Sequence, residues 1–363
     1  MVTQSNSNTF FPPADPNKAP GPGEEDQQLL YDPALTWPKI SIVTPSFNQG
    51  IYIEETIRSV LLQNYPNLEY IIIDGGSSDE TVEIIKKYED KIKYWVSEPD
   101  RGQSHAINKG LALCTGEIFN WLNSDDTYLQ GTLQKVALAF RKDSSIQFVS
   151  GYENQVEADG NTYVSKGTYL LDRLEQTIEL CEVTQPSTFF RLAAIRKIHG
   201  VSEDLHYIMD GEMWVKLLLC YGQKNFIKIH EPLANFRLHE NSKTVSNTVV
   251  NNFLYERASI IIDLQRCIGV PAGIRKIYQE SIYKTPVLYE LNRDWQMDPG
   301  VISRRKLRIY FIKKFIINRF INGTRANVLL GIKILIQSGS LDLFLLKSTA
   351  KFLFNKYPSA KAE

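Results

Sequence analysis

Strand-like and helix-like segments alternate regularly from Lys39 to Asp126, and this alternation constrains the fold more than any other feature of the chain. Apolar runs such as KISIVTPSF and LEYIIIDGG are each followed by a stretch with helical spacing of its apolar residues. The strands are apolar almost without interruption, which is typical of strands buried on both faces. The sequence therefore predicts an α/β fold with a mostly parallel sheet flanked by helices.

Each predicted strand ends in polar residues. The four endings are Thr44-Pro45-Ser46, Asp74-Gly75-Gly76-Ser77, Glu98-Pro99-Asp100 and Asn123-Ser124-Asp125-Asp126. In open α/β sheets the ligand site lies beyond the carboxyl ends of the strands. Four such endings in succession predict one shared site.

The alternation weakens after about residue 145. The stretch IQFVSGYENQVEADGNTYVSK predicts a hairpin around Asp159-Gly160, and DGEMWVKLLLCYG predicts a helix that ends at Gly222. The first 38 residues are rich in Asn, Ser, Pro and Gly and predict a flexible leader. Residues 246–363 have a mainly helical pattern, so we expect three parts, with boundaries near residues 38 and 245.

Charge is spread unevenly along a chain whose formal net charge is zero. From Val301 onward there are thirteen Lys and Arg residues against two Asp and Glu. The tail sequence RRKLRIYFIKKFIINRF leaves two interpretations open, a helix on an anionic membrane surface or a helix packed on the main domain. No nucleic-acid reading motif accompanies these basic residues, so we expect no nucleic-acid partner.

The four cysteines are scattered and form no CxxC pair, which argues against a zinc site and a disulfide framework and favours a reducing compartment. The N-terminus lacks a secretory signal pattern, and no apolar run reaches the roughly 18 residues that span a bilayer. We expect a cytoplasmic protein, peripheral at the inner face of the cell membrane if the tail binds lipid.

Two adjacent carboxylates, Asp125 and Asp126, end an apolar strand in WLNSDD. Neighbouring like charges are tolerated where a hard divalent cation binds, and Mg²⁺ and Mn²⁺ prefer oxygen ligands. The alternative is that one of them caps a helix beginning near Tyr128. Their place on the shared strand edge favours the metal.

Three stretches together resemble the family 2 glycosyltransferases of the GT-A fold, and in order they are ISIVTPSFNQGIYIEETIRSVLLQNYPNLEYIIIDGGSSDET, DRGQSHAINKGLALCTGEI and WLNSDD. The resemblance covers residues 39–245, about 57% of the chain, and implies that this part is a catalytic domain. It implies inverting transfer of a sugar from a nucleotide-diphosphate donor, with the UDP type favoured, assisted by Mg²⁺ or Mn²⁺. The implied acceptor is a saccharide or lipid-linked saccharide used in cell-surface polysaccharide or glycolipid synthesis.

The resemblance also assigns the donor side of the site. Asp74 resembles the carboxylate that hydrogen-bonds the base. Asn123 stands at the first position of the family's Asp-x-Asp motif, where this sequence departs and loses one charge. The metal is expected on Asp125, with Asp126 and His239 as further ligands. The other residues implied in nucleotide-sugar binding are Thr44, Pro45, Ser46, Phe47, Asn48, Gly102, Gln103, Ser124 and Arg237. An ordinary surface loop is the alternative for the segment around Arg237 and His239.

An inverting transfer needs a general base for the acceptor hydroxyl. Asp210 in IMDGEMWVKL resembles the family's acidic motif, and Glu212 and Gln185 are expected on the acceptor side. Helix capping for the two acids and core packing for Gln185 stay open as alternatives. A Rossmann dehydrogenase or methyltransferase would need G-x-G-x-x-G after the first strand, which is absent. A non-catalytic nucleotide- or glycan-binding relative is the remaining alternative, because of Asn123.

Overall fold

The computed structural model describes residues 31, 34–240, 242–243, 250–282 and 296–322. Most of the expected leader, and the basic tail beyond residue 322, lie outside these residues. Tyr31 and Trp37 fall within the expected leader but pack against Tyr65, with ring centroids 5.5 and 5.9 Å from that of Tyr65. Packing on the main domain therefore begins before residue 39.

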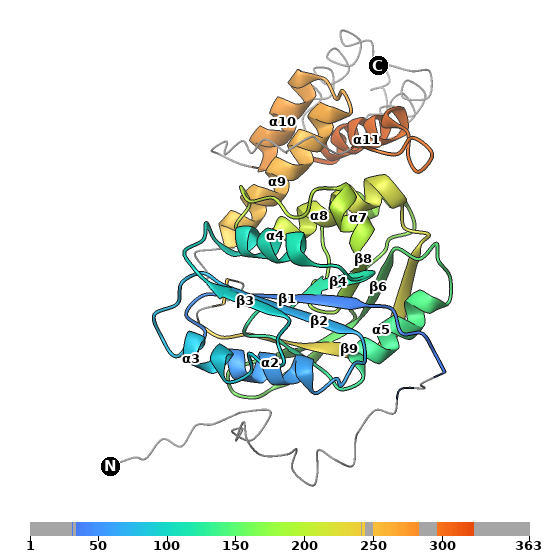
Figure 1. Cartoon of the computed structure of the whole chain (residues 1–363). Coiled ribbons are helices and arrows are strands. Elements are labelled where there is room, and N and C mark those ends of the chain that lie inside the picture. The colour runs from blue at the N-terminus through green and yellow to red at the C-terminus, as the bar shows by residue number, and fades with distance from the viewer. Residues whose placement is uncertain (1–30, 32–33, 241, 244–249, 283–295, 323–363) are drawn as a thin grey trace, which may run out of the picture. The chain divides into compact units, whose positions relative to one another are not determined.

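A single mixed sheet organises the described part of the main domain (Figure 1). Its strand order is β3-β2-β1-β4-β8-β6-β9-β5, and β7 pairs with β6. The strands are β1 (Ile40–Ser46), β2 (Leu68–Asp74), β3 (Tyr94–Ser97), β4 (Ile118–Trp121), β5 (Thr127–Tyr128), β6 (Phe148–Val156), β7 (Thr162–Ser165), β8 (Thr188–Arg191) and β9 (Phe226–Arg237). The first four strands pair in parallel, whereas β8 runs antiparallel to both β4 and β6. The predicted α/β class is confirmed.

Helices cover both faces of the parallel part of the sheet. In Figure 1, α2 (Ile53–Leu61) and α3 (Thr81–Lys86) lie on one face, and α4 (Gln103–Leu113) lies on the other. Gly110 allows α4 to pack tightly on β1, because a Cβ at this position would lie 2.4 Å from a methyl carbon of Val43. Both faces are therefore closed, which explains why β1 is buried along its whole length. The remaining helices of this domain are α5 (Thr132–Arg141), α6 (Leu174–Leu180), α7 (Leu192–Lys197) and α8 (Met209–Tyr221).

The expected hairpin around Asp159-Gly160 is formed by β6 and β7. Gly160 has φ +87°, a left-handed conformation that favours glycine, and the backbone N–H of Asn161 donates to the Asp159 carboxylate at 2.9 Å. The register places Glu153 opposite Ser165 and Gln155 opposite Tyr163. These pairs fix which side chains share a face of the hairpin.

The chain divides into two compact units, one containing residues 1–257 and 292–301 and the other containing 258–291 and 302–363. Helix α9 (Val250–Cys267) passes from the first unit into the second, which also contains α10 (Ala272–Ile282) and α11 (Arg304–Asn322). The boundaries expected near residues 38 and 245 stay predictions. Among the described helices, none has both the length and the apolar character that crossing a membrane requires. All four cysteines are free thiols.

Candidate functional site

A pocket of about 950 Å³ opens where the parallel strands end. Each of the four polar strand endings contributes to its wall, through Ser46, Gly75, Asp100 and Asp125 respectively. The strand endings therefore meet at one site, as the sequence predicts. The rest of the lining comes from later in the chain and includes Glu153, Tyr169, Gln185, Asp210 and Lys243.

Asp126 is held beneath the pocket rather than within its lining. Its carboxylate accepts hydrogen bonds from the backbone N–H of Arg237 at 3.1 Å and from the Asn123 amide at 3.2 Å. Burial, followed by the neighbouring charge of Asp125, raises the pKa of Asp126 well above its usual range. The helix-cap alternative for these acids is wrong, because they lead into β5 and the next helix begins only at Thr132.

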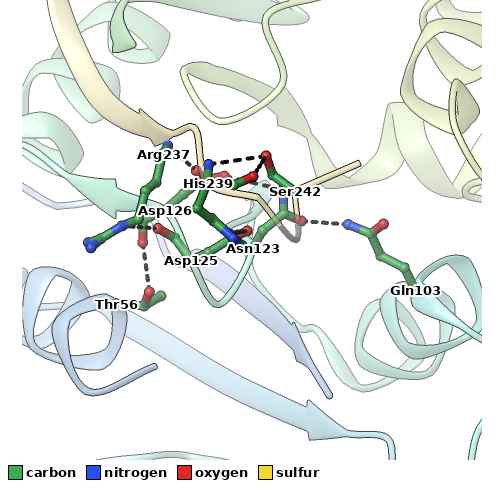
Figure 2. Close-up of polar contacts among 8 residues, drawn as sticks. All are labelled: Thr56, Gln103, Asn123, Asp125, Asp126, Arg237, His239 and Ser242. Carbon is green, nitrogen blue, oxygen red and sulfur yellow. Dashed lines mark hydrogen bonds and ion pairs between the residues drawn. The ribbon is translucent and has the colours of Figure 1, made fainter. Parts of the chain in front are cut away.

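Asp125 lines the pocket, and residues at the end of β9 and just after it contact Asp125 (Figure 2). The Nε2 atom of His239 lies 3.1 Å from Oδ2 of Asp125, and the Arg237 guanidinium donates to the Asp125 carbonyl at 3.1 Å. Arg237 also forms an ion pair with Glu55 of α2 at 2.6 Å. Its guanidinium is thus used within the protein, and Arg237 ties α2, WLNSDD and β9 together.

The oxygen ligands of the site suit a hard divalent cation through one half-buried carboxylate, that of Asp125. Within the described ranges, no group of three or more His, Cys, Asp and Glu side chains is arranged to hold a metal. Mg²⁺ is commonly bound by one or two carboxylates together with substrate phosphates, and Asp125 offers such a carboxylate. His239 is buried and contacts Asp125, so it can orient this ligand. Direct coordination by Asp126 or His239 stays a prediction.

Asp210 lies in the first turn of α8 and lines the pocket. The backbone N–H of Gly211 donates to its Oδ1 at 2.8 Å. Burial raises the pKa of the Asp210 carboxyl to about 6. A carboxylate with such a pKa is largely ionised at neutral pH yet more basic than an exposed Asp, as a general base requires.

Glu212 follows Asp210 by two residues but faces away from the pocket. Two residues rotate a helix by about 200°, so the neighbouring acid points to the other side of α8. There Glu212 forms a buried ion pair with Lys216 at 2.7 Å. Gln185 does line the pocket, and its amide braces the end of β4 by donating to Asn120 at 3.0 Å and to the Trp121 carbonyl at 2.6 Å.

The predicted donor residues divide into lining and supporting groups. Asp74 is fully buried, and its carboxylate accepts hydrogen bonds from the Gly76 and Ser77 backbone and from the Ser77 and Ser97 hydroxyls. The pocket lining includes Pro45, Ser46, Phe47, Gly102, Gln103, Asn123, Ser124 and Arg237. It does not include Thr44, Asn48 or Asp74, which shape the strand ends beneath it.

Gln103 links the donor side to a lysine from the loop after β9. Its side chain donates to Asn123 at 2.7 Å and accepts from Lys243 at 2.8 Å. The Lys243 ammonium also donates to the His206 carbonyl at 3.0 Å. The negative charges of Asp125 and Asp210 both favour protonated Lys243, although burial, the largest effect, lowers its pKa. One of its three N–H donors has no partner among the described residues.

Three acids that line the pocket had no role assigned from the sequence, namely Asp100, Glu153 and Glu182, the last of which forms an ion pair with Arg257 at 3.1 Å. Asp100 fills the space left by Gly75, where a Cβ would lie 2.9 Å from its Oδ2 and 3.3 Å from the Phe47 ring. Glu153 lies on β6, and burial raises the pKa of its carboxyl to about 7. Asp100 was visible as part of a polar strand end. Glu153 belongs to no motif, and its only sequence signal is an acid inside an otherwise strand-like run.

Comparisons with known proteins agree with this geometry. The model of a family described as glycosyl transferase family 2 matches residues 41–198. An uncharacterized glycosyltransferase of Rickettsia typhi is 30% identical over 226 residues, which are 59% of this chain and 68% of the relative. The putative teichuronic acid biosynthesis glycosyltransferase TuaG of Bacillus subtilis is 38% identical over 219 residues, 56% of this chain and 81% of the relative. The crystal structure of TarS 1–349 of S. aureus in complex with UDP-GlcNAc superimposes with a TM-score of 0.52 and 16% identity, covering 83% of this chain and 81% of TarS.

Proposed function

The chain belongs to the family 2 glycosyltransferases, and from this premise we propose that it transfers a sugar with inversion from a nucleotide-diphosphate donor to a saccharide hydroxyl. One observation carries the proposal. Asp125 and Asp210 line the same pocket as Lys243, and both of their charges, together with that of Glu256, favour the protonated form of the lysine. A site for a cation with diphosphate and a site for a base are therefore combined around one space.

On the donor side, the strand ends supply the surfaces that a nucleotide needs. The exposed ring of Phe47 offers a stacking face, and the Asp100 carboxylate beside it can accept from a ring N–H of a base. Uracil and guanine carry such an N–H, and we favour a uridine donor. Asp125 would hold Mg²⁺ or Mn²⁺, which, when bound, offsets the negative charge of the leaving diphosphate.

On the acceptor side, Asp210 acts as the base. The acceptor oxygen attacks the anomeric carbon while its proton passes to the Asp210 carboxylate. The bond between the anomeric carbon and the diphosphate oxygen breaks, and its electron pair leaves with the nucleoside diphosphate. The free N–H donor of Lys243 stabilises that developing charge. Attack from the side opposite to the leaving group inverts the anomeric configuration.

The biological setting follows from the relatives. TuaG is described as a putative enzyme of teichuronic acid biosynthesis, and this supports a role for the present chain in synthesis of a cell-surface polysaccharide. The basic residues from Val301 onward would suit a peripheral contact with anionic lipid, where a lipid-linked acceptor is found.

The test uses Asp210→Asn in the full chain, with nucleoside-diphosphate release as the readout. The purified protein is incubated with UDP-, GDP- and dTDP-sugars and Mn²⁺, and nucleotide binding is followed separately by thermal shift. We expect the wild type to consume one donor class and the variant to lose roughly 10²- to 10⁴-fold in turnover. Stabilisation by the nucleotide should be unchanged. Equal turnover in both proteins would reject Asp210 as the base, and a wild type without turnover would reject the proposed transfer.

A further inference from the structure

The pocket continues onto the β6–β7 hairpin, which no donor role accounts for. Opposite residues of an antiparallel pair point to the same face, and side chains alternate along each strand. Glu153 and Gln155 of β6 therefore share a face with their partners Ser165 and Tyr163 of β7. Three of these four residues line the pocket, so this face of the hairpin forms an extension of its wall.

Two exposed tyrosines belong to this region, Tyr163 on the hairpin itself and Tyr169 in the segment after it. Tyr163 is 55% exposed and lies opposite Gln155, and Tyr169 is 53% exposed and lines the pocket. The Tyr169 ring is not loose, because the Lys228 ammonium lies 5.1 Å from its centroid and donates to the neighbouring Thr168 carbonyl at 3.1 Å. Tyr169 thus presents an aromatic surface to the pocket, and Tyr163 presents a second one on the same face of the hairpin as Gln155.

Between these rings and the base lies a buried carboxyl group with spare hydrogen-bonding capacity. Glu153 is 6% exposed, and its Oε1 accepts one hydrogen bond of 3.3 Å from Gln155. Among the described residues, its Oε2 has no hydrogen-bond partner and no cation lies within ion-pair distance. Glu153 lines the same pocket as Asp210 and Asp125, the proposed base and the proposed metal ligand. Because Glu153 lines the pocket, its Oε2 is available to a hydroxyl group of a ligand.

We propose that the part of the pocket wall formed by Glu153, Gln155 and Tyr169, together with Tyr163 beside Gln155, is an acceptor subsite for an uncharged pyranose. The proposal rests on the proposed function and names the substrate class of that same pocket. The carbon-bound hydrogens of a pyranose ring pack on aromatic faces, and its hydroxyls bond to the carboxyl and amide groups. An acidic sugar is disfavoured, because Glu153 and Asp210 both lie at this end of the pocket and like charges repel. A lipid chain would require a continuous apolar patch, which the polar Glu153, Gln155 and Ser165 interrupt.

Binding can be measured without turnover by saturation-transfer NMR on the full chain with UDP and Mn²⁺ present. The probes are methyl glucopyranoside, methyl galactopyranoside and methyl 2-acetamido-2-deoxyglucopyranoside, with methyl glucuronoside as the acidic counterpart. We expect saturation transfer to at least one neutral glycoside and at least a threefold weaker signal for the glucuronoside. The double variant Tyr163→Ala/Tyr169→Ala should lose the signal, whereas Tyr163→Phe, which keeps the ring, should retain it.

Tyr94→Ala is the matched control, since Tyr94 is an exposed tyrosine on β3 that does not line the pocket. It should keep both nucleotide and glycoside binding. If UDP binds but no neutral glycoside does, or if the glucuronoside binds as well as they do, the subsite proposal is wrong and the donor proposal stands. Glycoside signals that survive in the double variant also overturn it. If no nucleotide binds the wild type, the proposed function is wrong, and the subsite proposal, which rests on it, is rejected as well.

Discussion

The imidazole of His239 contacts the carboxylate of Asp125 through Nε2 and Oδ2, which lie 3.1 Å apart. The two residues come from separate segments, one at the end of β4 and the other after β9. The Tyr52 ring packs on the other side of the imidazole, with ring centroids 4.7 Å apart. A ring held in this way fixes the direction in which Asp125 presents its free oxygen to the pocket.

This contact predicts a graded loss of metal dependence. Asp125→Ala should abolish the part of the thermal stabilisation by UDP that requires Mn²⁺, which is about 2.7 kcal/mol at 100 times the dissociation constant. His239→Ala should lower the affinity for Mn²⁺ by roughly 10- to 100-fold, because the substitution removes the group that orients the Asp125 carboxylate. Titration of Mn²⁺ against the melting temperature measures both effects. A His239→Ala variant with wild-type metal affinity would show that Asp125 needs no orientation.

The pKa of Asp210 predicts the acidic limb of the activity profile. Burial raises the pKa of this carboxyl to about 6, and the protonated form cannot accept a proton from the acceptor. We expect kcat/KM to fall below a pH of about 6, whereas an ordinary Asp would stay active to about pH 4. Nucleotide binding at each pH, followed by thermal shift, controls for loss of the donor. A midpoint near pH 4 with intact binding would be inconsistent with Asp210 as the base.

Glu153 predicts a pH-dependent stability penalty. Its pKa is about 7 in the folded protein against the ordinary 4.5, so the folded state binds the proton more tightly than the unfolded state does. Stability therefore decreases as the pH rises from 4.5 to 7. At pH 8, Glu153→Gln should be more stable than the wild type by up to about 3 kcal/mol, and the difference should vanish below pH 4.5. Urea unfolding measures it, with exposed Glu157→Gln as a control that should change stability by less than about 0.5 kcal/mol at every pH.

Gly75 predicts a steric effect on the donor side. A methyl group there would lie 2.9 Å from the Asp100 carboxylate and 3.3 Å from the Phe47 ring, so both groups must move away from the base position. We expect Gly75→Ala to weaken UDP binding roughly tenfold, about 1.4 kcal/mol. Gly131→Ala, at a φ of +77° before α5 and outside the pocket lining, should lower stability without changing UDP affinity. Calorimetric titration of UDP separates the two, and unchanged affinity in Gly75→Ala would remove Asp100 and Phe47 from the base site.

The parallel half of the fold was predictable because each of its strands can be recognised from its own residues. Continuous apolar runs such as β1 and β2 can be recognised without knowing their neighbours, and the topology then brings their ends together. Asp125 was found in this way, and so was the pocket edge that contains Asp100. The same rule could not say that Asp74 bonds to its own loop and to Ser97 of β3, because that depends on how the residues after β2 turn back toward β3.

The second half of the site was harder to predict because it depends on contacts between distant segments. Glu153 reaches the pocket only through the pairing of β6 with both β7 and β9, which includes irregular register near Tyr152. Glu212 was predicted in the site but lies outside it. It follows Asp210 by only two residues, and this closeness in sequence suggested a shared site. The helix rotates it into a buried ion pair with Lys216 instead.

The turn at Asp159, Gly160 and Asn161 therefore affects the proposed acceptor subsite, although none of its residues lines the pocket. It sets the alignment of β6 against β7, and a slip of one residue would turn every side chain of a strand to the other face. Because β6 is also held by β8 and β9, only β7 would turn, and Val164 would then replace Tyr163 and Ser165 on the face that they share with Glu153 and Gln155. Inserting or deleting one residue in this turn is consequently a route to a new acceptor preference that leaves the donor half of the enzyme as it is.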